Sequence, residues 1–316
     1  VHLGLFRHPM VALLLPGQGS QFVGMGRDLA DRFPEARAVF EEADDALGFS
    51  LSRLMWEGPE EELTATLNAQ PAILTHSVAV HRVVASRLGA VRFAAGHSLG
   101  EFSAYVAAEG LRFDDAVRTV RRRGELMYRS GEDRPGTMAA VLGLDDEAVE
   151  AVCREATGED GACVPANYNS PGQIVISGDV AAVERAIELA KQAGARRAMR
   201  LNVSGAFHSP LMEVAESGLA EQLETVTIAR PAYPVVSNVT AEPVDDPDTA
   251  RELLVHQLTS PVRWTACVRT MIDAGVTEFL ELGPGSVLSG LLRRIDRSAK
   301  SVTRGTAVEV EAFLKG

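Results

Sequence analysis

The sequence has few cysteines, no long apolar run and no excess of positive charge. Its three cysteines are far apart and form no Cys-x-x-Cys pair, so we expect free thiols rather than a disulfide framework or a zinc site. No apolar run approaches the roughly 20 residues that cross a bilayer. The first nine residues, VHLGLFRHP, lack the apolar core of a secretion signal and are left out of the fold prediction. These absences predict a cytoplasmic protein with no metal and no membrane segment.

The charge balance is acidic. The chain contains 43 Asp and Glu residues and 31 Lys and Arg residues, which gives a net charge of −12. Nucleic-acid phosphates need a basic footprint, so this balance disfavours nucleic acid, and an acidic protein partner would need a local basic patch. The 316 residues, 46% of them hydrophobic, suffice for one large globular domain with an insertion or for two medium domains.

The first part of the chain alternates apolar runs, glycine turns and amphipathic segments. MVALLL (10–15) predicts a buried strand, PGQGSQ a tight turn and FVGMGRDLADRF (22–33) a first helix. This alternation predicts an α/β fold. Further elements are expected as helices at 70–89, 99–109, 114–130 and 260–275, strands at 91–95, 233–238 and 277–283, and a last helix after GPGS.

The middle third has a different rhythm. Its segments read in the order βαββαβ, which is the ferredoxin-like unit. Asp145 and Asp179 precede the two helices and are expected as their N-caps. We therefore predict a large α/β domain formed by residues 10–134 and 205–316, interrupted by a small subdomain at 135–204. The segments are TMAAVLGL, DDEAVEAVCREAT, ACVPANY, GQIVISG, DVAAVERAIELAKQAG and ARRAMRLNV.

The stretch GHSLG places Ser98 between two glycines, after a predicted strand and before a predicted helix. This pattern and context fit the nucleophile elbow, where glycines leave room for a sharp turn and the Leu99 amide lies at a helix N-terminus. The pattern alone is common, so Ser98 could also be a serine that merely caps the helix. A nucleophilic serine would need a base.

Histidine is the usual base, and the chain has seven. His208 follows a predicted strand in the loop NVSGAFHSPLM, where a second catalytic group is expected, and we rank it ahead of His256 and His97. His76 and His81 lie within an amphipathic helix and are expected as surface or satisfied core residues. His2 and His8 fall in the nine residues left out.

The run AVRTVRRRGELMYR contains one arginine that faces inward. On a single helix, Arg121 and Arg122 point about 100° and 200° away from the apolar face, whereas Arg123 lies about 60° from its centre. We expect Arg118, Arg121 and Arg122 on a solvated face. An arginine that leans inward needs an anionic partner, either a carboxylate such as Glu101 or the carboxylate of a substrate.

The turn PGQGSQ is not a phosphate loop. The third glycine of G-x-G-x-x-G would fall at Phe22, and no Gly-Lys-Ser/Thr follows. We expect instead that the Gln18 amide forms the second wall of an oxyanion hole opposite Ser98, with the Leu99 amide as the first.

Taken together, several motifs resemble the malonyl-CoA:acyl carrier protein transacylases of fatty acid synthesis. They occur in the family's order and at its spacings from about residue 11 to residue 295. The resemblance implies a hydrolase-like α/β core with a ferredoxin-like insert. The motifs are PGQGSQ, QPA, GHSLGE, Arg123-Gly124, NSPGQIVISG, FHSPLM, QLTSPVRW and ELGPG.

The resemblance assigns roles residue by residue. It implies that Ser98 is acylated, that His208 is its base, and that the main-chain carbonyl of Gln257 orients His208, so that no acidic third member is expected. Arg123 would bind the malonyl carboxylate, and Gln18 and Leu99 would supply the oxyanion amides. Phe207 fits the malonyl type of the family. Met127, Asn167, Asn169 and His97 are expected to contribute to the substrate pocket.

The resemblance also implies substrates and partners. Malonyl-CoA and CoA would be substrate and product, the phosphopantetheine thiol of acyl carrier protein would receive the acyl group, and no cofactor would be needed. We expect a monomer. Arg196, Arg197 and Arg200 form either a basic patch for the carrier or a plain solvated edge.

Three alternatives stay open. A transacylase acting in trans on a polyketide synthase would look nearly the same. A serine thioesterase or esterase would share the elbow but release the acyl group to water. A non-enzymatic binder of acyl thioesters would make Ser98 and His208 coincidental.

Overall fold

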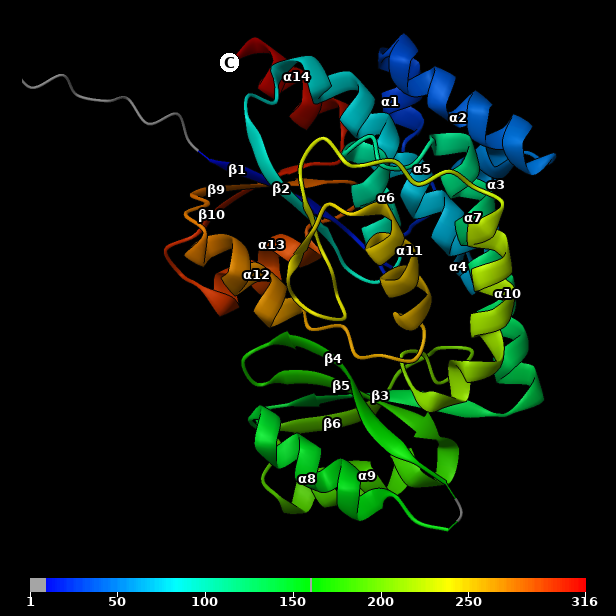
Figure 1. Cartoon of the computed structure of the whole chain (residues 1–316), viewed down its shortest axis with the longest axis vertical. Coiled ribbons are helices and arrows are strands. Elements are labelled where there is room, and N and C mark those ends of the chain that lie inside the picture. Colours follow the sequence, from blue (N-terminus) through cyan, green and yellow to red (C-terminus); the bar gives the residue numbers. More distant parts are fainter. Residues whose placement is uncertain (1–9, 160) are drawn as a thin grey trace, which may run out of the picture.

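A six-stranded sheet forms the centre of the larger part of the molecule (Figure 1). The computed structural model describes residues 10–159 and 161–316; the first nine residues, including His2 and His8, lie outside them. The strand order is β10-β9-β1-β2-β7-β8, and every neighbouring pair is parallel except β7 with β8. The strands are β1 (Val11–Leu15), β2 (Val91–Gly96), β7 (Val235–Val236), β8 (Pro243–Val244), β9 (Glu278–Leu282) and β10 (Lys300–Arg304).

Both faces of this sheet are buried, which is why its central strands are continuously apolar. All five residues of β1 are buried. Leu13 and Leu15 pack on one side with the core of the N-terminal helices, while Ala12 and Leu14 pack on the other with α12 (Trp264–Asp273) and α13 (Val287–Ile295). The alternation of the strand therefore divides one apolar run between two cores.

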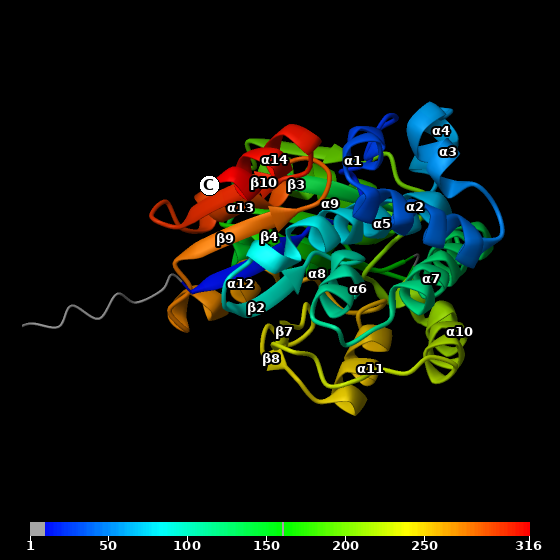
Figure 2. The same cartoon turned by 90° about the horizontal axis from the view of Figure 1, so that it is seen from above.

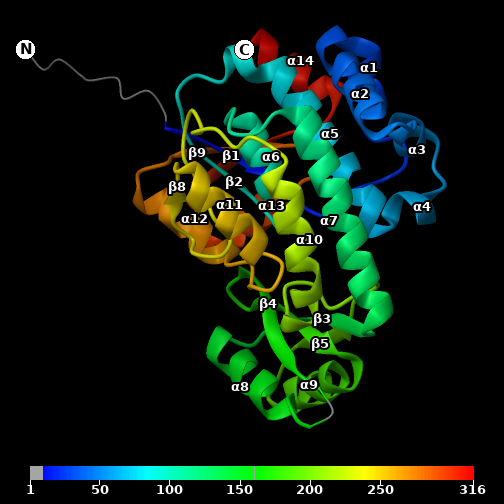
Figure 3. The same ribbon diagram turned by 45° about the vertical axis from the view of Figure 1, so that its right-hand side comes forward.

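Helices from the first half of the chain cover the first face. Helices α2, α5 and α7 contact one another beside the sheet (Figure 2). Helix α10 lies along α7 (Figure 3). The remaining bounds are α1 (Arg27–Arg32), α2 (Pro34–Leu47), α3 (Leu51–Glu57), α4 (Glu60–Thr64), α5 (Thr66–Val84), α6 (Gly100–Ala107), α7 (Phe113–Asp133), α10 (Glu213–Glu224), α11 (Pro247–His256) and α14 (Ala307–Lys315), with short 3-10 turns η1 (Ala85–Arg87) and η2 (Pro210–Met212).

A second, four-stranded antiparallel sheet lies below the first in Figure 1. Its order is β4-β5-β3-β6, and α8 and α9 cover its outer face with a separate apolar core. On the other side, Met138 and Val175 belong to the core of the larger part. The elements are β3 (Gly136–Leu142), α8 (Asp146–Ala156), β4 (Cys163–Ser170), β5 (Gln173–Asp179), α9 (Val180–Gln192) and β6 (Arg197–Arg200).

Main-chain hydrogen bonds join β4 of the second sheet to the segment that precedes α12. The Tyr168 amide donates to the Val262 carbonyl (2.9 Å), and the Val262 amide donates to the Ala166 carbonyl (2.8 Å). Strand β4 is thus fixed to the segment that enters α12. Because α12 packs on the larger sheet, this contact fixes the position of β4, which carries Asn167 and Asn169 of the pocket, relative to that sheet.

Three local predictions are wrong, two about helices and one about Arg121. The first helix begins at Arg27 rather than at residue 22, because Gly24 and Gly26 take left-handed backbone (φ 99° and 77°) that breaks the helical pattern. The helix after GPGS is not the last, since β10 and α14 follow it. Asp179 is confirmed at the N-cap position of α9, although its side chain binds Arg134 and the Ala162 amide rather than an amide of the helix.

Arg121 does not lie on a solvated face. Its guanidinium bonds Asn68 and Glu125 and stacks on Phe49, because α5 packs against α7 at that point. Asp145, by contrast, is confirmed as the N-cap of α8, where its side chain accepts from the Ala148 amide.

Within residues 10–159 and 161–316, no helix is long and apolar enough to span a membrane. The three cysteines are buried and free, as predicted. In the same described ranges, no group of three or more His, Cys, Asp or Glu side chains could hold a metal ion.

Candidate active site

Ser98 lies on a strained turn between β2 and α6. Its φ of 52° is left-handed, a conformation that costs a non-glycine residue energy and must be held by its surroundings. The neighbouring glycines allow the turn, because a Cβ on Gly96 would collide with the main chain of Gly100, and one on Gly100 would collide with the Leu15 carbonyl. The hydroxyl is thereby directed into the pocket.

His208 is held against the Ser98 hydroxyl. Its Nε2 lies 2.8 Å from Ser98 Oγ, and its Nδ1 lies 2.9 Å from the main-chain oxygen of Gln257. A carbonyl oxygen only accepts, so Nδ1 carries the proton and Nε2 is left to accept from the serine. Burial and the positive charge of Arg123 lower the pKa of His208 to about 3, which keeps the imidazole unprotonated.

His208 also lies on a left-handed turn. His208 has a φ of 55°, and the structure buries it among the residues of the FHSPLM motif. His256 is exposed at the end of α11 and is not part of this site. His76 is a core residue whose Nε2 bonds the Gly305 carbonyl (2.8 Å), and His81 is half-buried on the same helix.

Arg123 is buried beside the serine with only 1% of its surface exposed. Its Nη2 donates to Ser98 Oγ (3.1 Å) and to Gln257 Oε1 (2.8 Å), and its Nη1 donates to Gln70 Oε1 (2.7 Å). Burial lowers its pKa to about 10, so it stays charged at neutral pH. No carboxylate among the described residues forms an ion pair with it, and its Nε has no partner. The guanidinium is therefore available to an anion in the pocket.

Gln257 serves the site with two different groups. Its main-chain oxygen holds His208, while its side-chain oxygen holds Arg123. Its side-chain nitrogen donates to Glu101 Oε2 (2.7 Å) and to the Ser98 carbonyl (3.1 Å). One residue at the end of α11 thus links the serine, the base and the arginine.

Two amides that the sequence suggested for an oxyanion hole are unoccupied by protein acceptors. Across the described chain, the backbone N–H groups of Gln18 and Leu99 donate no hydrogen bond. The Ser98 amide, in contrast, is bound by Asn238 Oδ1 (2.7 Å). Gln18 and Leu99 both line the pocket that contains Ser98.

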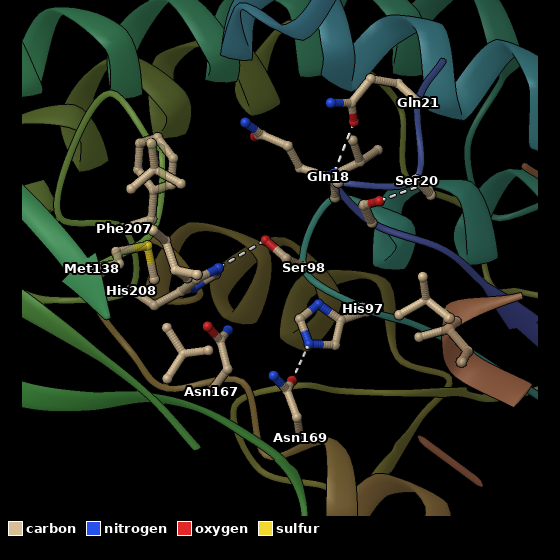
Figure 4. A pocket seen from close by; sticks show the side chains of 18 of the residues that line it. Gln18, Ser20, Gln21, His97, Ser98, Met138, Asn167, Asn169, Phe207 and His208 are labelled. Carbon is tan, nitrogen blue, oxygen red and sulfur yellow. Dashed lines mark hydrogen bonds between the residues drawn. The ribbon is translucent and has the colours of Figure 1, made fainter. Parts of the chain in front are cut away.

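The pocket has a volume of about 380 Å³ and is lined by residues from both parts of the chain, among them Ser98 after β2 and Asn167 on β4. Figure 4 shows Ser98 facing His208, with His97 bonded to Asn169 (Nε2 to Oδ1, 2.8 Å) on the other side. The wall combines polar groups near the serine with apolar side chains toward Phe207 and Met138. The structure brings together ten of the eleven predicted site residues along its lining: Gln18, His97, Ser98, Leu99, Arg123, Met127, Asn167, Asn169, Phe207 and His208. Gln257 lies behind them.

Three further residues of the site were not assigned to it from sequence. Gln70 orients Arg123 from α5, Asn238 holds the Ser98 amide and the Gly96 carbonyl, and Glu101 binds Gln257. Gln70 lies in the QPA motif but had no role of its own, and Glu101 of GHSLGE was considered only as a possible partner of Arg123. Asn238 ends a predicted strand and carried no signal.

The fold and this site together define a class, the α/β enzymes that transfer acyl groups through a serine. Residues 13–310 match the family described as acyl transferase domain. A malonyl CoA-acyl carrier protein transacylase of Bacillus subtilis (strain 168) is 49% identical over 305 residues, with 96% of both chains covered. The protein of that name from Escherichia coli (strain K12) is 47% identical, over 90% of this chain and 92% of the relative.

Solved structures agree with these relatives. An acyl-carrier-protein-S-malonyltransferase from Bartonella henselae superposes with a TM-score of 0.92 at 46% identity, covering 97% of this chain and 98% of that one. A type II PKS acyl-carrier protein in complex with its malonyl-transacylase contains a chain with a TM-score of 0.93 at 42% identity, covering 97% and 99%. This chain belongs to the malonyl CoA-acyl carrier protein transacylase family.

Proposed function

We propose that this protein transfers a malonyl group from malonyl-CoA to the phosphopantetheine thiol of acyl carrier protein, supplying extender units for fatty acid synthesis. The single observation that carries the substrate assignment is Arg123, a buried guanidinium 3.1 Å from Ser98 Oγ without a carboxylate partner among the described residues. A malonyl group carries its free carboxylate a short distance from the reacting carbonyl, where such a cation would bind it.

In the first half-reaction, Ser98 Oγ attacks the thioester carbonyl while its proton moves to His208 Nε2. The tetrahedral oxyanion accepts from the Gln18 and Leu99 amides, each worth about 3 kcal/mol by comparison with oxyanion-hole deletions. The carbon–sulfur bond then breaks, and His208 returns the proton to the sulfur of CoA. The second half-reaction is the reverse with the carrier thiol, so the kinetics are ping-pong. Neither step needs a metal or a redox cofactor.

The chain also fits a two-domain division. We propose a hydrolase-like α/β domain at 10–134 and 205–316 and a ferredoxin-like subdomain at 135–204. The order βαββαβ and the antiparallel strand order β4-β5-β3-β6 support the second assignment. The acyl pocket would be shaped by Met127, Phe207, Asn167, Asn169 and His97. We expect a cytoplasmic monomer, with Arg196, Arg197 and Arg200 on an exposed edge as candidates for contact with the carrier.

A chase experiment tests the proposal. The enzyme is loaded with labelled malonyl-CoA, freed of CoA, and mixed with buffer, holo-carrier protein or apo-carrier protein. We expect label to move to the holo-carrier within a turnover and to stay on the enzyme in the other two samples. Rapid release to water would identify a thioesterase or esterase instead. Fatty-acid and polyketide carriers, compared side by side, distinguish the two transacylase assignments.

The lowered pKa of His208 predicts an unusual pH dependence. A base with an ordinary imidazole pKa would lose activity below about 6.5. Because the pKa of His208 is about 3, we expect kcat/KM for malonyl loading to stay flat between about pH 8 and about pH 5. The unfolded chain takes up this proton at a higher pH than the folded chain, so His208 lowers the free energy of unfolding as pH falls from about 6.5 toward 3.

Rapid-quench loading measured across this range, with unfolding followed at each pH, checks both statements. An acid limb centred near pH 6.5 in a protein that remains folded would contradict the assignment of His208 as a base with a lowered pKa.

A further inference from the structure

Glu101 is a fully buried carboxylate that touches neither the pocket nor the Ser98 hydroxyl. It lies in the first turn of α6, behind the nucleophile, with no exposed surface. Its Oε2 accepts from the Asn238 amide (3.1 Å) and from Gln257 Nε2 (2.7 Å), whereas its Oε1 has no partner among the described residues. A buried acid with a two-donor contact on one oxygen must act through the groups that donate to it.

The Gln257 side chain can be held in either of two orientations. In the observed one, Nε2 faces Glu101 and Oε1 accepts from Arg123 Nη2 (2.8 Å). The reverse orientation would turn an N–H₂ group toward a guanidinium, which has only donors, and an oxygen toward a carboxylate. Arg123 and Glu101 therefore enforce the same orientation from opposite ends. Without Glu101, only Arg123 and the Ser98 carbonyl would oppose a rotated Gln257 amide.

The protonation state of Glu101 does not alter this contact. Burial raises its pKa to about 7, against the opposing effect of the bonds from Asn238 and Gln257. When the group is protonated, the unpartnered Oε1 can carry the proton, so Oε2 accepts in both states. Arg123 contributes a favourable charge interaction without contacting Glu101.

We propose that Glu101 is a positioning residue that orients the Gln257 amide and, through it, fixes the Arg123 guanidinium where the acyl carboxylate binds. Its role is thus the preference for a carboxylated acyl group rather than the reactivity of Ser98. This inference rests on the proposed function, since it assumes that Arg123 binds the substrate carboxylate.

The test compares Glu101→Met with Glu101→Gln. Methionine has a similar length and no strong acceptor, so Gln257 loses its anchor; the glutamine oxygen can take the place of Oε2 and accept both bonds. We expect Glu101→Met to lower the ratio of malonyl to acetyl kcat/KM by about tenfold or more, the effect of one lost hydrogen bond to a charged site. Glu101→Gln should keep that ratio within about threefold.

Two controls accompany these variants. Ser103→Ala alters another buried side chain of α6 whose Oγ has no partner among the described residues, and it should leave the ratio unchanged. A neutral serine-reactive probe carries no carboxylate for Arg123 to bind, so its rate of reaction with Ser98 should change little in Glu101→Met. Should Glu101→Met fail to fold, Glu101→Asp withdraws the carboxylate by one methylene and should shift the ratio in the same direction.

An unchanged ratio in Glu101→Met, or in Glu101→Asp where that variant replaces it, overturns the proposal. So does an equal loss of malonyl and acetyl transfer, which is the signature of a merely structural residue, or an equal loss of the ratio in Glu101→Gln. Malonylation of wild-type Ser98 is measured in the same series. Its absence would refute the proposed function, whereas its presence with an unchanged ratio would refute the positioning role alone.

Discussion

Replacing Ser98 with alanine is expected to abolish the covalent malonyl adduct and to lower transfer by about 10⁴-fold or more, as for other enzymes that lose their nucleophile. Alanine keeps the backbone at the elbow but removes the hydroxyl oxygen that we propose forms the acyl bond. His208 and Arg123 stay in place through Gln257 and Gln70. Intact mass after incubation with malonyl-CoA, with peptide mapping of the adduct, measures the result.

The fold should survive this substitution. Among the described residues, Ser98 Oγ bonds His208 and Arg123 alone, so the free energy of unfolding should change by about 1 kcal/mol. Ser103→Ala, a buried serine on the following helix, serves as the matched control and should be malonylated as the wild type is. A stoichiometric adduct in Ser98→Ala would remove this serine from its role.

Replacing Arg123 with alanine is expected to lower kcat/KM for malonyl transfer by about 10² to 10³, while acetyl transfer falls less than about tenfold. The first figure follows from losing one partner of a buried, hydrogen-bonded charge pair, which costs about 3 to 4 kcal/mol. An acetyl group has no carboxylate and does not use that contact. Steady-state kinetics with the two thioesters give the ratio directly.

Arg122→Ala is the matched control, because this neighbour is 37% exposed and pairs only weakly with Glu125. It should leave both activities near wild type. The charge that we propose binds the substrate carboxylate also lowers the pKa of His208, so Arg123→Ala should raise that pKa and move the acid limb of acetyl transfer to higher pH. Equal losses for malonyl and acetyl transfer would show that Arg123 does not recognise the carboxylate.

Local sequence patterns were enough to predict the central strands, the turn at Ser98 and the inward position of Arg123. An unbroken apolar run marks β1, glycines mark the elbow, and helical periodicity alone turns Arg123 inward. The prediction that Arg121 is solvated was wrong, because helical periodicity within α7 carries no information about α5, which packs beside it. The strand β10 and the helix α14 were missed although TAVE, residues 306–309, forms a capping box at the start of that helix.

The contacts that hold the site together could not be read in this way. Gln257 orients His208 with a main-chain oxygen, which every residue possesses, and only the resemblance to a family indicated the position. Gln70 and Asn238 act across 53 and 140 residues of chain, and nothing in their immediate surroundings distinguishes them from ordinary polar residues. Such long-range pairings are set by tertiary packing.

Gln257 uses its main chain to orient His208 and its side chain to orient Arg123, so the two functions depend on different groups. In a Ser-His-Asp triad, the histidine is instead oriented by a side chain. The carbonyl that fixes the base survives any substitution at that position which keeps the end of α11 intact. The side chain that fixes Arg123 does not. Substitution of Gln257 should therefore change which acyl groups the enzyme accepts while Ser98 and His208 keep their contact. New substrate preferences can then evolve at this position through variants that all remain active.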